Sequence, residues 1–320
     1  MTLPAPVFRH GLYLLSRRVI WQLFLLLPDQ EAVQIFKYTL GATLLSFKPK
    51  ERLEVHAGVL MSNHLHLVAY DPEAERTNFL NRFHSPLARA INKHRGRKGR
   101  LFDLPTAKDK SSILDRAAAL HSVVYTICNP VQAGLVRWPH EWPGSLGDWR
   151  QLLTVPIVAT KPRQFFDQRG PDEGGKPEEV LYYLTMPRCF AQEGMQKDEY
   201  EAMIRDAVQA ECERIHAERD APVLGVEAAL SLPTDTRTAN PDTQIDRDTD
   251  RFRCDPARVK EFLDLWVEWV ASYMAVRKRW KRGERQGVEF PPGTDEYRRL
   301  EDAPVAELDP DSPFAWLHPD

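Results

Sequence analysis

Two histidines in the segment from Met61 to His66 are placed to act together on one ligand. Apolar residues on both sides of the pair indicate a buried strand. Because successive side chains of a strand alternate between its two faces, His64 and His66 point to the same side, about 7 Å apart along the strand. Two imidazoles in this arrangement can converge on one metal ion. Taken alone, the pattern more often reflects two histidines with a structural role.

A tyrosine and an asparagine further along the chain are one helical turn apart. Tyr125 and Asn129 lie in a stretch whose apolar residues recur at helical spacing. Residues four apart share one face of a helix, and His121 continues that face by one more turn. A phenol can serve as a nucleophile and an amide oxygen as a metal ligand. Alone, this pattern is also typical of a core tyrosine followed by a capping asparagine.

The helix that carries this tyrosine is predicted over residues 111–128. Ser111 or Ser112 is the expected N-cap, with Asp115 in the first turn, where a carboxylate suits the helix dipole. Pro130 disfavours a helical conformation for the residue before it, so we expect the helix to end at Asn129.

Together the two motifs resemble those of the HUH single-tyrosine transposases. His64-Leu65-His66, preceded by Met61 and Asn63, is similar to their Met-Pro-Asn-His-hydrophobic-His run. The stretch that begins at Tyr125 is similar to the Tyr-Ile-x-x-Asn-Pro-Val-x-Ala-Gly-Leu-Val run of the subgroup called REP-associated tyrosine transposases. The resemblance covers roughly residues 8–150, and the order and separation of the motifs both agree with the family.

The chain departs from the family pattern at two places. Ser62 stands where the family usually has proline. The family also commonly has a Trp/Phe-x-x-Arg element before the tyrosine helix, whereas residues 101–105 offer the aromatic Phe102 without an arginine. The second departure concerns a DNA contact that the arginine would make, and it leaves the metal ligands and the nucleophile untouched.

The resemblance implies a transposase-like endonuclease and strand transferase that acts on single-stranded, hairpin-forming DNA repeats. Tyr125 would be the nucleophile that forms a 5′-phosphotyrosine. His64, His66 and Asn129 would hold a divalent metal, Mg²⁺ or Mn²⁺, because a mixed nitrogen and oxygen set accepts either ion. His121 is a candidate fourth ligand or proton acceptor.

The sequence is also compatible with two alternative functions. The first is a non-catalytic regulator, derived from a transposase, that binds DNA hairpins. The second is a rolling-circle-type nickase, which shares the histidine pair. Whether the chain acts as a monomer or as a homodimer is left open by the sequence.

The charge of the chain is divided unequally between its two halves. Residues 1–150 contain 20 Lys and Arg against 12 Asp and Glu, a net charge of +8. Residues 151–320 contain 23 against 34, a net charge of −11. No carboxylate occurs from Arg76 to Phe102, and uncompensated cations are typical of a polyphosphate partner. The expected DNA contacts in this stretch are Arg89, Lys93, Arg95, Arg97, Lys98 and Arg100.

The order of predicted elements indicates an α+β fold. The expected elements are a strand at 8–20, a helix at 29–45, strands at 52–60 and 64–70, and helices at 76–94 and 111–128. This order is compatible with an antiparallel βαββαβ sheet that has helices on one face. The resemblance implies such a ferredoxin-like core, with the histidine strand central, followed by a mostly helical C-terminal extension.

Composition divides the chain into four expected parts. These are a catalytic domain at 1–150, a helical extension at 151–232, a polar linker at 233–255, and a C-terminal helix and tail at 256–320. The predicted C-terminal helix ends in six cations around Trp280, which suits either a helix C-terminus or contact with a base or phosphate.

Cysteine usage and hydropathy favour a cytoplasmic protein. The four cysteines form no Cys-x-x-Cys pair, so neither a zinc knuckle nor a disulfide framework is indicated. No signal peptide is visible, and no stretch approaches the roughly 20 apolar residues of a membrane-spanning helix. We therefore expect no membrane partner.

Overall fold

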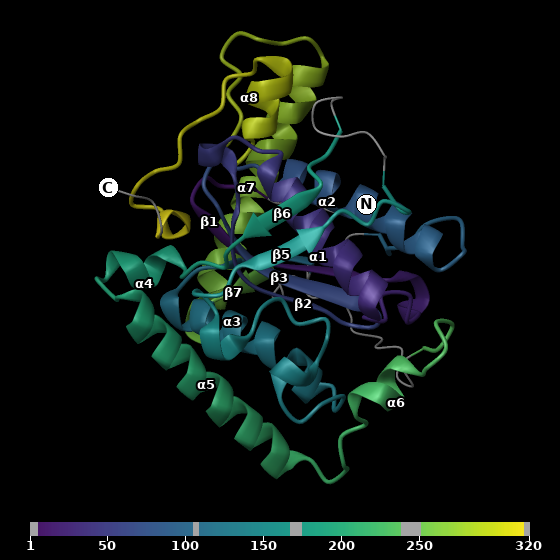
Figure 1. Ribbon diagram of the computed structural model, residues 1–320. Coiled ribbons are helices and arrows are strands. Elements are labelled where there is room, and N and C mark those ends of the chain that lie inside the picture. Colours follow the sequence, from purple (N-terminus) through teal and green to yellow (C-terminus); the bar gives the residue numbers. More distant parts are fainter. Residues whose placement is uncertain (1–5, 105–108, 167–174, 238–250, 317–320) are drawn as a thin grey trace.

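A five-stranded sheet forms the centre of the computed structural model, which describes residues 6–104, 109–166, 175–237 and 251–316 (Figure 1). Its strand order is β2-β3-β1-β4-β7, and all neighbours are antiparallel except β4 and β7. The strands are β1 (Gly11–Arg18), β2 (Glu54–Leu60), β3 (His64–Asp71), β4 (Lys110–Ile113) and β7 (Phe252–Arg253). The first four follow the order expected of a βαββαβ sheet, and the histidine strand β3 is internal.

Helices surround the sheet and dominate the second half of the chain. They are α1 (Gln30–Leu45), α2 (Arg76–His94), α3 (Arg116–Gln132), α4 (Arg188–Gln192), α5 (Lys197–Glu218), α6 (Val226–Leu230), α7 (Val259–Lys281) and α8 (Asp295–Glu301). A separate hairpin of β5 (Ile157–Thr160) and β6 (Glu179–Tyr182) packs against α1. The structure confirms the expected mixed α/β class with a mostly helical C-terminal part.

Cross-strand pairing decides which side chains share a face of the sheet. Ser16 of β1 pairs with His66 of β3, so both point to one face, whereas Tyr13 points to the other. The guanidinium of Arg76 lies 4.2 Å from the Tyr13 ring, which places α2 on the face opposite the histidines. The ring of Tyr125 contacts His66, so α3 covers the histidine face. The expected tyrosine helix therefore lies across the expected histidine strand. The expectation of helices on one face alone is wrong, because α2 and α3 cover opposite faces of the sheet.

The ends of the tyrosine helix differ from the sequence prediction. Ser111 and Ser112 belong to β4, where Ser111 pairs with Leu14, and are not N-caps. Asp115 is the N-cap, since its carboxylate accepts a 2.7 Å hydrogen bond from Ala118 N. The helix also continues past Pro130 to Gln132. Proline removes one donor, but later bonds, such as 2.9 Å from Ala133 N to Asn129 O, hold the last turn.

The segment after residue 150 shares the core of the sheet. Helix α5 runs along α3 (Figure 1), and one buried cluster extends from Leu12 on β1 to Ala229 on α6. The expected domain boundary at residue 150 stays a prediction. Residues on both sides of that position contribute to this one buried cluster. Residues 238–250 of the expected linker lie outside the described residues, while Phe252 and Arg253 form the edge strand β7.

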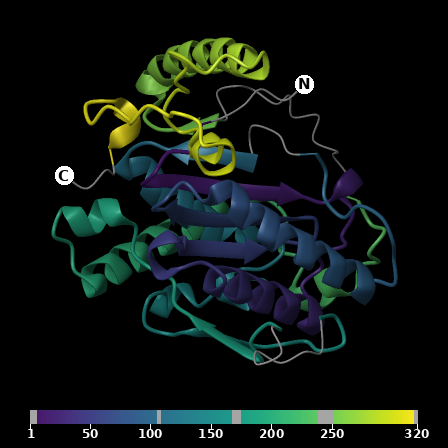
Figure 2. The ribbon, with the colours of Figure 1, turned by 90° about the horizontal axis from the view of Figure 1, so that it is seen from above.

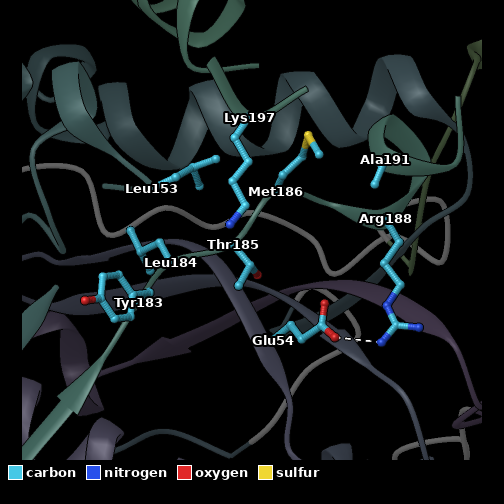
Figure 3. A pocket seen from close by; sticks show the side chains of 9 residues that line it. All are labelled: Glu54, Leu153, Tyr183, Leu184, Thr185, Met186, Arg188, Ala191 and Lys197. Carbon is cyan, nitrogen blue, oxygen red and sulfur yellow. Dashed lines mark hydrogen bonds and ion pairs between the residues drawn. The ribbon is translucent and has the colours of Figure 1, made fainter. Parts of the chain in front are cut away.

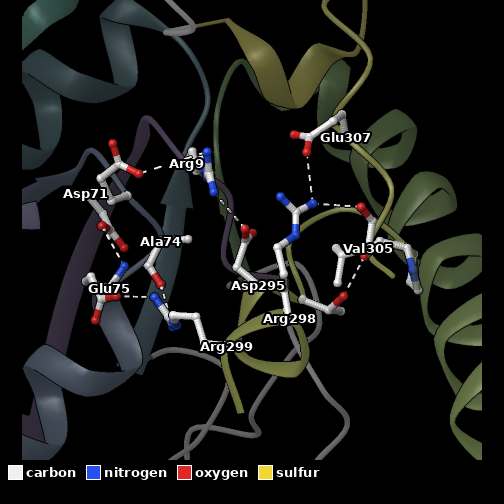
Figure 4. Close-up of polar contacts among 12 residues, drawn as sticks. Arg9, Asp71, Ala74, Glu75, Asp295, Arg298, Arg299, Val305 and Glu307 are labelled. Atoms are coloured by element: carbon white, nitrogen blue, oxygen red, sulfur yellow. Dashed lines mark hydrogen bonds and ion pairs between the residues drawn. The ribbon is translucent and has the colours of Figure 1, made fainter. Parts of the chain in front are cut away.

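The C-terminal helices lie along one side of the molecule, opposite the β5–β6 hairpin (Figure 2). Polar contacts attach α8 to the residue before α2 and to the segment before β1 (Figure 4). Arg299 forms an ion pair with Glu75, and Arg9 contacts Asp295 at 3.2 Å. The Trp280 ring is buried against Phe290 rather than presented to a base.

None of the described helices is long and apolar enough to cross a membrane.

Candidate active site

The two histidines lie side by side at the start of β3. Their ring centroids are 4.8 Å apart and the rings are steeply inclined, at 76°. His66 is buried and His64 is half-buried. Strand alternation accounts for this arrangement, because Leu65 between them points to the opposite face.

Neighbouring side chains orient each imidazole through one ring nitrogen. His64 Nδ1 lies 2.7 Å from Asn63 Oδ1, to which its N–H donates. Ser16 Oγ lies 2.6 Å from His66 Nδ1, in the cross-strand pair that joins β1 to β3. Hydrogen bonds at Nδ1 fix the ring orientation and leave Nε2 of each histidine for a second partner. For His64 that partner is Asn129 Oδ1, at 3.3 Å.

Burial and nearby cations keep both histidines neutral. Burial first, and then the charge of Arg18, lower the pKa of His64 to about 4. Burial also holds the pKa of His66 well below its usual range, helped by His64, Arg253 and Arg18. A neutral imidazole retains the lone pair that a metal ion requires.

The donor set fits a divalent cation. With Asn63 accepting from Nδ1, the Nε2 lone pair of His64 faces another acceptor, the Asn129 oxygen. Two acceptors at this distance are brought together favourably by a cation between them. Within the described residues, no group of three or more His, Cys, Asp or Glu side chains could hold a metal. The site beside Tyr125 instead combines two imidazoles with an amide.

Tyr125 joins this set from the helix that covers the histidine face. Its ring centroid lies 5.6 Å from that of His66 in an edge-to-face arrangement. The exposed ring of His121, one turn earlier on α3, stacks on Tyr125 at 6.4 Å with an interplanar angle of 22°. The structure thus brings the four expected site residues together at one place on the sheet, with His121 beside them. The four are Tyr125, His64, His66 and Asn129.

Three residues near this point were not identified from the sequence. Ser16 and Arg18 belong to β1, and only the β1–β3 register, which pairs Arg18 with His64, brings them to the histidines. Arg253 comes from β7, and its guanidinium lies 5.4 Å from the Tyr125 ring centroid. Residue spacing gives no signal for these positions because each depends on long-range strand pairing.

The expected DNA-contacting cations fall into two groups. Arg95 is engaged within the chain: it donates to Leu25 O at 3.1 Å and Leu27 O at 2.6 Å, and it forms an ion pair with Asp29. Arg97 donates to Asn92 Oδ1 at 2.9 Å. The exposed members of the set are Arg89, Lys93, Lys98 and Arg100.

A cavity of about 510 Å³ lies at the far end of β2 from the histidines (Figure 3). Glu54 and Arg188 form an ion pair at its wall, with an N–O distance of 2.7 Å, and the remaining lining is mostly apolar. Glu54 begins β2, whereas Leu60 at the other end of that strand pairs beside His64. The cavity is therefore separate from the tyrosine–histidine site.

Fold and site together define a mixed α/β protein with a tyrosine, two histidines and an asparagine on one face of its sheet. No protein-family model matches the chain, and no curated protein matches it. A solved structure of a REP-associated tyrosine transposase bound to a REP hairpin is similar at a TM-score of 0.37 and 17% sequence identity. The similarity covers 45% of this chain and 82% of that one. A likeness this distant leaves the function to be argued from the site itself.

Proposed function

We propose that the chain is a metal-dependent enzyme that cleaves and rejoins single-stranded DNA containing hairpin-forming repeats, through a 5′-phosphotyrosine intermediate. The observation that carries this proposal is the convergence of Tyr125 with His64, His66 and Asn129 on one face of the sheet. A nucleophile beside a metal-binding set is the arrangement that phosphodiester cleavage requires. The sequence motifs around Tyr125 and the histidine pair give the same assignment by resemblance.

The residues that would hold the metal are His64 and His66, through Nε2, and Asn129, through Oδ1. A bound Mg²⁺ or Mn²⁺ would neutralise charge on the non-bridging oxygens of the scissile phosphate. Asn63 and Ser16 keep the imidazoles in position by their contacts at Nδ1.

Tyr125 supplies the nucleophilic oxygen. Its Oη forms a bond to phosphorus while the bond from phosphorus to the 3′ oxygen breaks, which leaves a 3′ hydroxyl and a 5′-phosphotyrosine. His121 is the proposed acceptor of the phenolic proton, because the partial burial of its exposed ring and the charge of Arg253 lower its pKa and favour the neutral form. The leaving 3′ oxygen takes up one proton. Attack by a 3′ hydroxyl reverses these changes, rejoins the strand and releases Tyr125.

Arg253 is proposed to bind the phosphate that Tyr125 attacks. Its guanidinium lies over the tyrosine ring, and β7 fixes its backbone, since Leu114 N donates to Arg253 O at 2.9 Å. An arginine in this place supplies the positive charge that residues 101–105 lack. Such a group stabilises negative charge on the phosphate in the transition state.

Covalent trapping of the unmodified protein tests the proposed function. With Mn²⁺ and a single-stranded hairpin oligonucleotide labelled at both ends, we expect an adduct that survives denaturation and contains the fragment on the 3′ side of the cleavage point, joined through its 5′ phosphate. The fragment on the 5′ side should be released with a free 3′ hydroxyl. Chelation of the metal should prevent both. Tight binding without an adduct would instead indicate a hairpin-binding regulator, and cleavage to free 5′-phosphate ends would indicate a hydrolytic nuclease.

The exposed cations of α2 and the following loop are expected to bind the DNA backbone. Changing Lys93, Lys98 and Arg100 together to glutamine should weaken binding of all single strands alike. The slope of the log of the binding constant against log salt should become shallower by roughly 0.7 for each of the three phosphate contacts that is lost. The measurement is a salt titration by fluorescence anisotropy, and an unchanged slope would contradict this assignment.

Arg95→Gln is the matched control for that measurement. Because Arg95 already donates to Leu25 O and Leu27 O, its loss should lower the free energy of unfolding by about 1–3 kcal/mol and leave the salt slope unchanged. A flattened slope in the Arg95 variant would return this residue to the DNA-binding set.

A further inference from the structure

Trp21 is a large aromatic side chain that the fold leaves open to solvent. Its exposed fraction is 66%, whereas its neighbour Ile20 is buried. It lies in the short 3-10 segment Ile20–Gln22, which follows β1. A tryptophan that served the core would be buried, so packing within the chain does not explain this position.

The backbone that presents Trp21 is strained. Trp21 has a φ of 53° and Gln22 a φ of 55°, so two consecutive residues other than glycine occupy the left-handed region. Such conformations persist only where the surrounding structure holds them, and they concentrate at binding and catalytic sites. The hydrogen bond from Gln22 N to Val19 O, at 3.0 Å, closes the turn that holds the indole outward.

This turn is joined to the loop that carries the first histidine. Val19 N donates to Asn63 O at 2.8 Å, and the Asn63 side chain donates to Gln22 O at 3.5 Å. Asn63 is also the residue that orients His64. The exposed indole therefore lies on a turn that is hydrogen-bonded to Asn63, the residue that orients a proposed metal ligand.

The same turn adjoins a cationic loop and, through a second contact, one further arginine. Ile20 N donates to Leu101 O at 2.9 Å, directly after the exposed Lys98 and Arg100. Leu23 forms a β-bridge with Arg237, whose guanidinium lies 5.9 Å from the Trp21 ring centroid. An exposed aromatic ring beside cations is the arrangement with which proteins bind single-stranded nucleic acid, through base stacking and phosphate contacts.

We propose that Trp21 is a stacking platform for one unpaired base of the DNA strand. Lys98, Arg100 and Arg237 contact the adjoining phosphates, and the strand leads from the platform toward Tyr125. The ligand is an unpaired nucleotide, and stacking alone is tolerant of base identity because every base has a π face. This inference rests on the proposed function for its substrate class, and it adds a site that binds the strand apart from the reacting phosphate.

The test measures binding in a Tyr125→Phe background, so that cleavage does not alter the ligand. Adding Trp21→Ala should weaken binding of a hairpin oligonucleotide with an unpaired 5′ extension by about 5- to 150-fold. Trp21→Phe should recover most of the affinity, because it keeps an aromatic face. The salt slope should not change, since no phosphate contact is removed.

A matched control and an abasic scan make the test specific. Tyr183→Ala removes another exposed aromatic ring, at the far end of β2, and should leave binding unchanged. Replacing the unpaired nucleotides one at a time by abasic sites should identify one position at which Trp21→Ala has no further effect. Three results for Trp21→Ala would each overturn the proposal. They are an equal loss of affinity with every abasic oligonucleotide, an affinity within twofold of the Tyr125→Phe background, and a changed salt slope.

Failure of this inference can be told apart from failure of the proposed function. The adduct assay on the unmodified protein tests catalysis without reference to Trp21. A protein that forms the adduct but binds equally well with Trp21→Ala retains the proposed function and loses the stacking site. A protein that binds through Trp21 without forming an adduct retains the stacking site and loses the catalytic assignment.

Discussion

Tyr125→Phe is expected to abolish the covalent protein–DNA adduct completely while leaving hairpin binding within about twofold of the unmodified protein. Phenylalanine keeps the ring that packs against His66 and lies beneath Arg253, and it removes only the hydroxyl. Without that oxygen no bond to phosphorus can form at this position. The measurement is a denaturing gel of labelled oligonucleotide after incubation with Mn²⁺, alongside a binding titration.

The control for this experiment is a second tyrosine, at an exposed position. Tyr183→Phe removes a hydroxyl at the opposite end of β2 and should form the adduct at the unmodified rate. An adduct that persists in Tyr125→Phe would move the nucleophile elsewhere. Tyr70 is a poor substitute, because its hydroxyl contacts His10 and burial raises its pKa.

Arg253→Gln should slow adduct formation by about 100- to 1000-fold at saturating DNA, the range seen when one transition-state donor is removed. Lysine at this position should recover part of the rate, because it restores the charge without the planar guanidinium. Single-turnover rates at varied DNA concentration separate the effect on chemistry from any effect on affinity. The melting temperature of each variant checks that β7 remains paired.

Arg251, two residues before Arg253, offers a matched control. Its guanidinium lies 4.2 Å from the Trp266 ring centroid on α7, whereas that of Arg253 lies over Tyr125. Arg251→Gln should therefore leave the single-turnover rate unchanged. If Arg253→Gln reacts as fast as the Arg251 variant, Arg253 does not contact the reacting phosphate.

Local periodicity was sufficient to predict most elements around the site. Strand alternation places His64 and His66 on one face, and the spacing of four places Tyr125 and Asn129 on one side of a helix. Both relations depend only on residues close in sequence. The helix predicted at 76–94 coincides with α2 for the same reason, since its apolar stripe is continuous.

The start of the tyrosine helix could not be predicted because distant pairing decides it. Ser111 and Ser112 are typical N-cap residues, yet they form β4 by pairing with Leu14 and Tyr13 of β1. A four-residue strand is too short to show a period of its own. Asp115 then becomes the cap, and the helix begins several residues later than its local pattern indicates.

Two charged residues near the site also depend on distant contacts that local sequence does not reveal. Arg95 lies in a run of cations that is typical of a DNA-binding surface, but the fold brings backbone carbonyls and Asp29 to its guanidinium. Arg253 lies in a polar stretch that is typical of a linker, and its place above Tyr125 depends on the parallel pairing of β7 with β4. Composition describes the charge of such residues and not their neighbours.

The pairing of β7 with β4 also has a consequence for the chain while it is being synthesised. Proteins are made from the N-terminus at roughly 5–20 residues per second, and early segments begin to fold before later ones exist. A ribosome-bound chain can thus present its histidines and tyrosine before residue 253 has been added. We expect such a nascent chain to be nearly unreactive toward DNA, so that strand breakage begins only after the part of the chain that supplies Arg253 has emerged and docked.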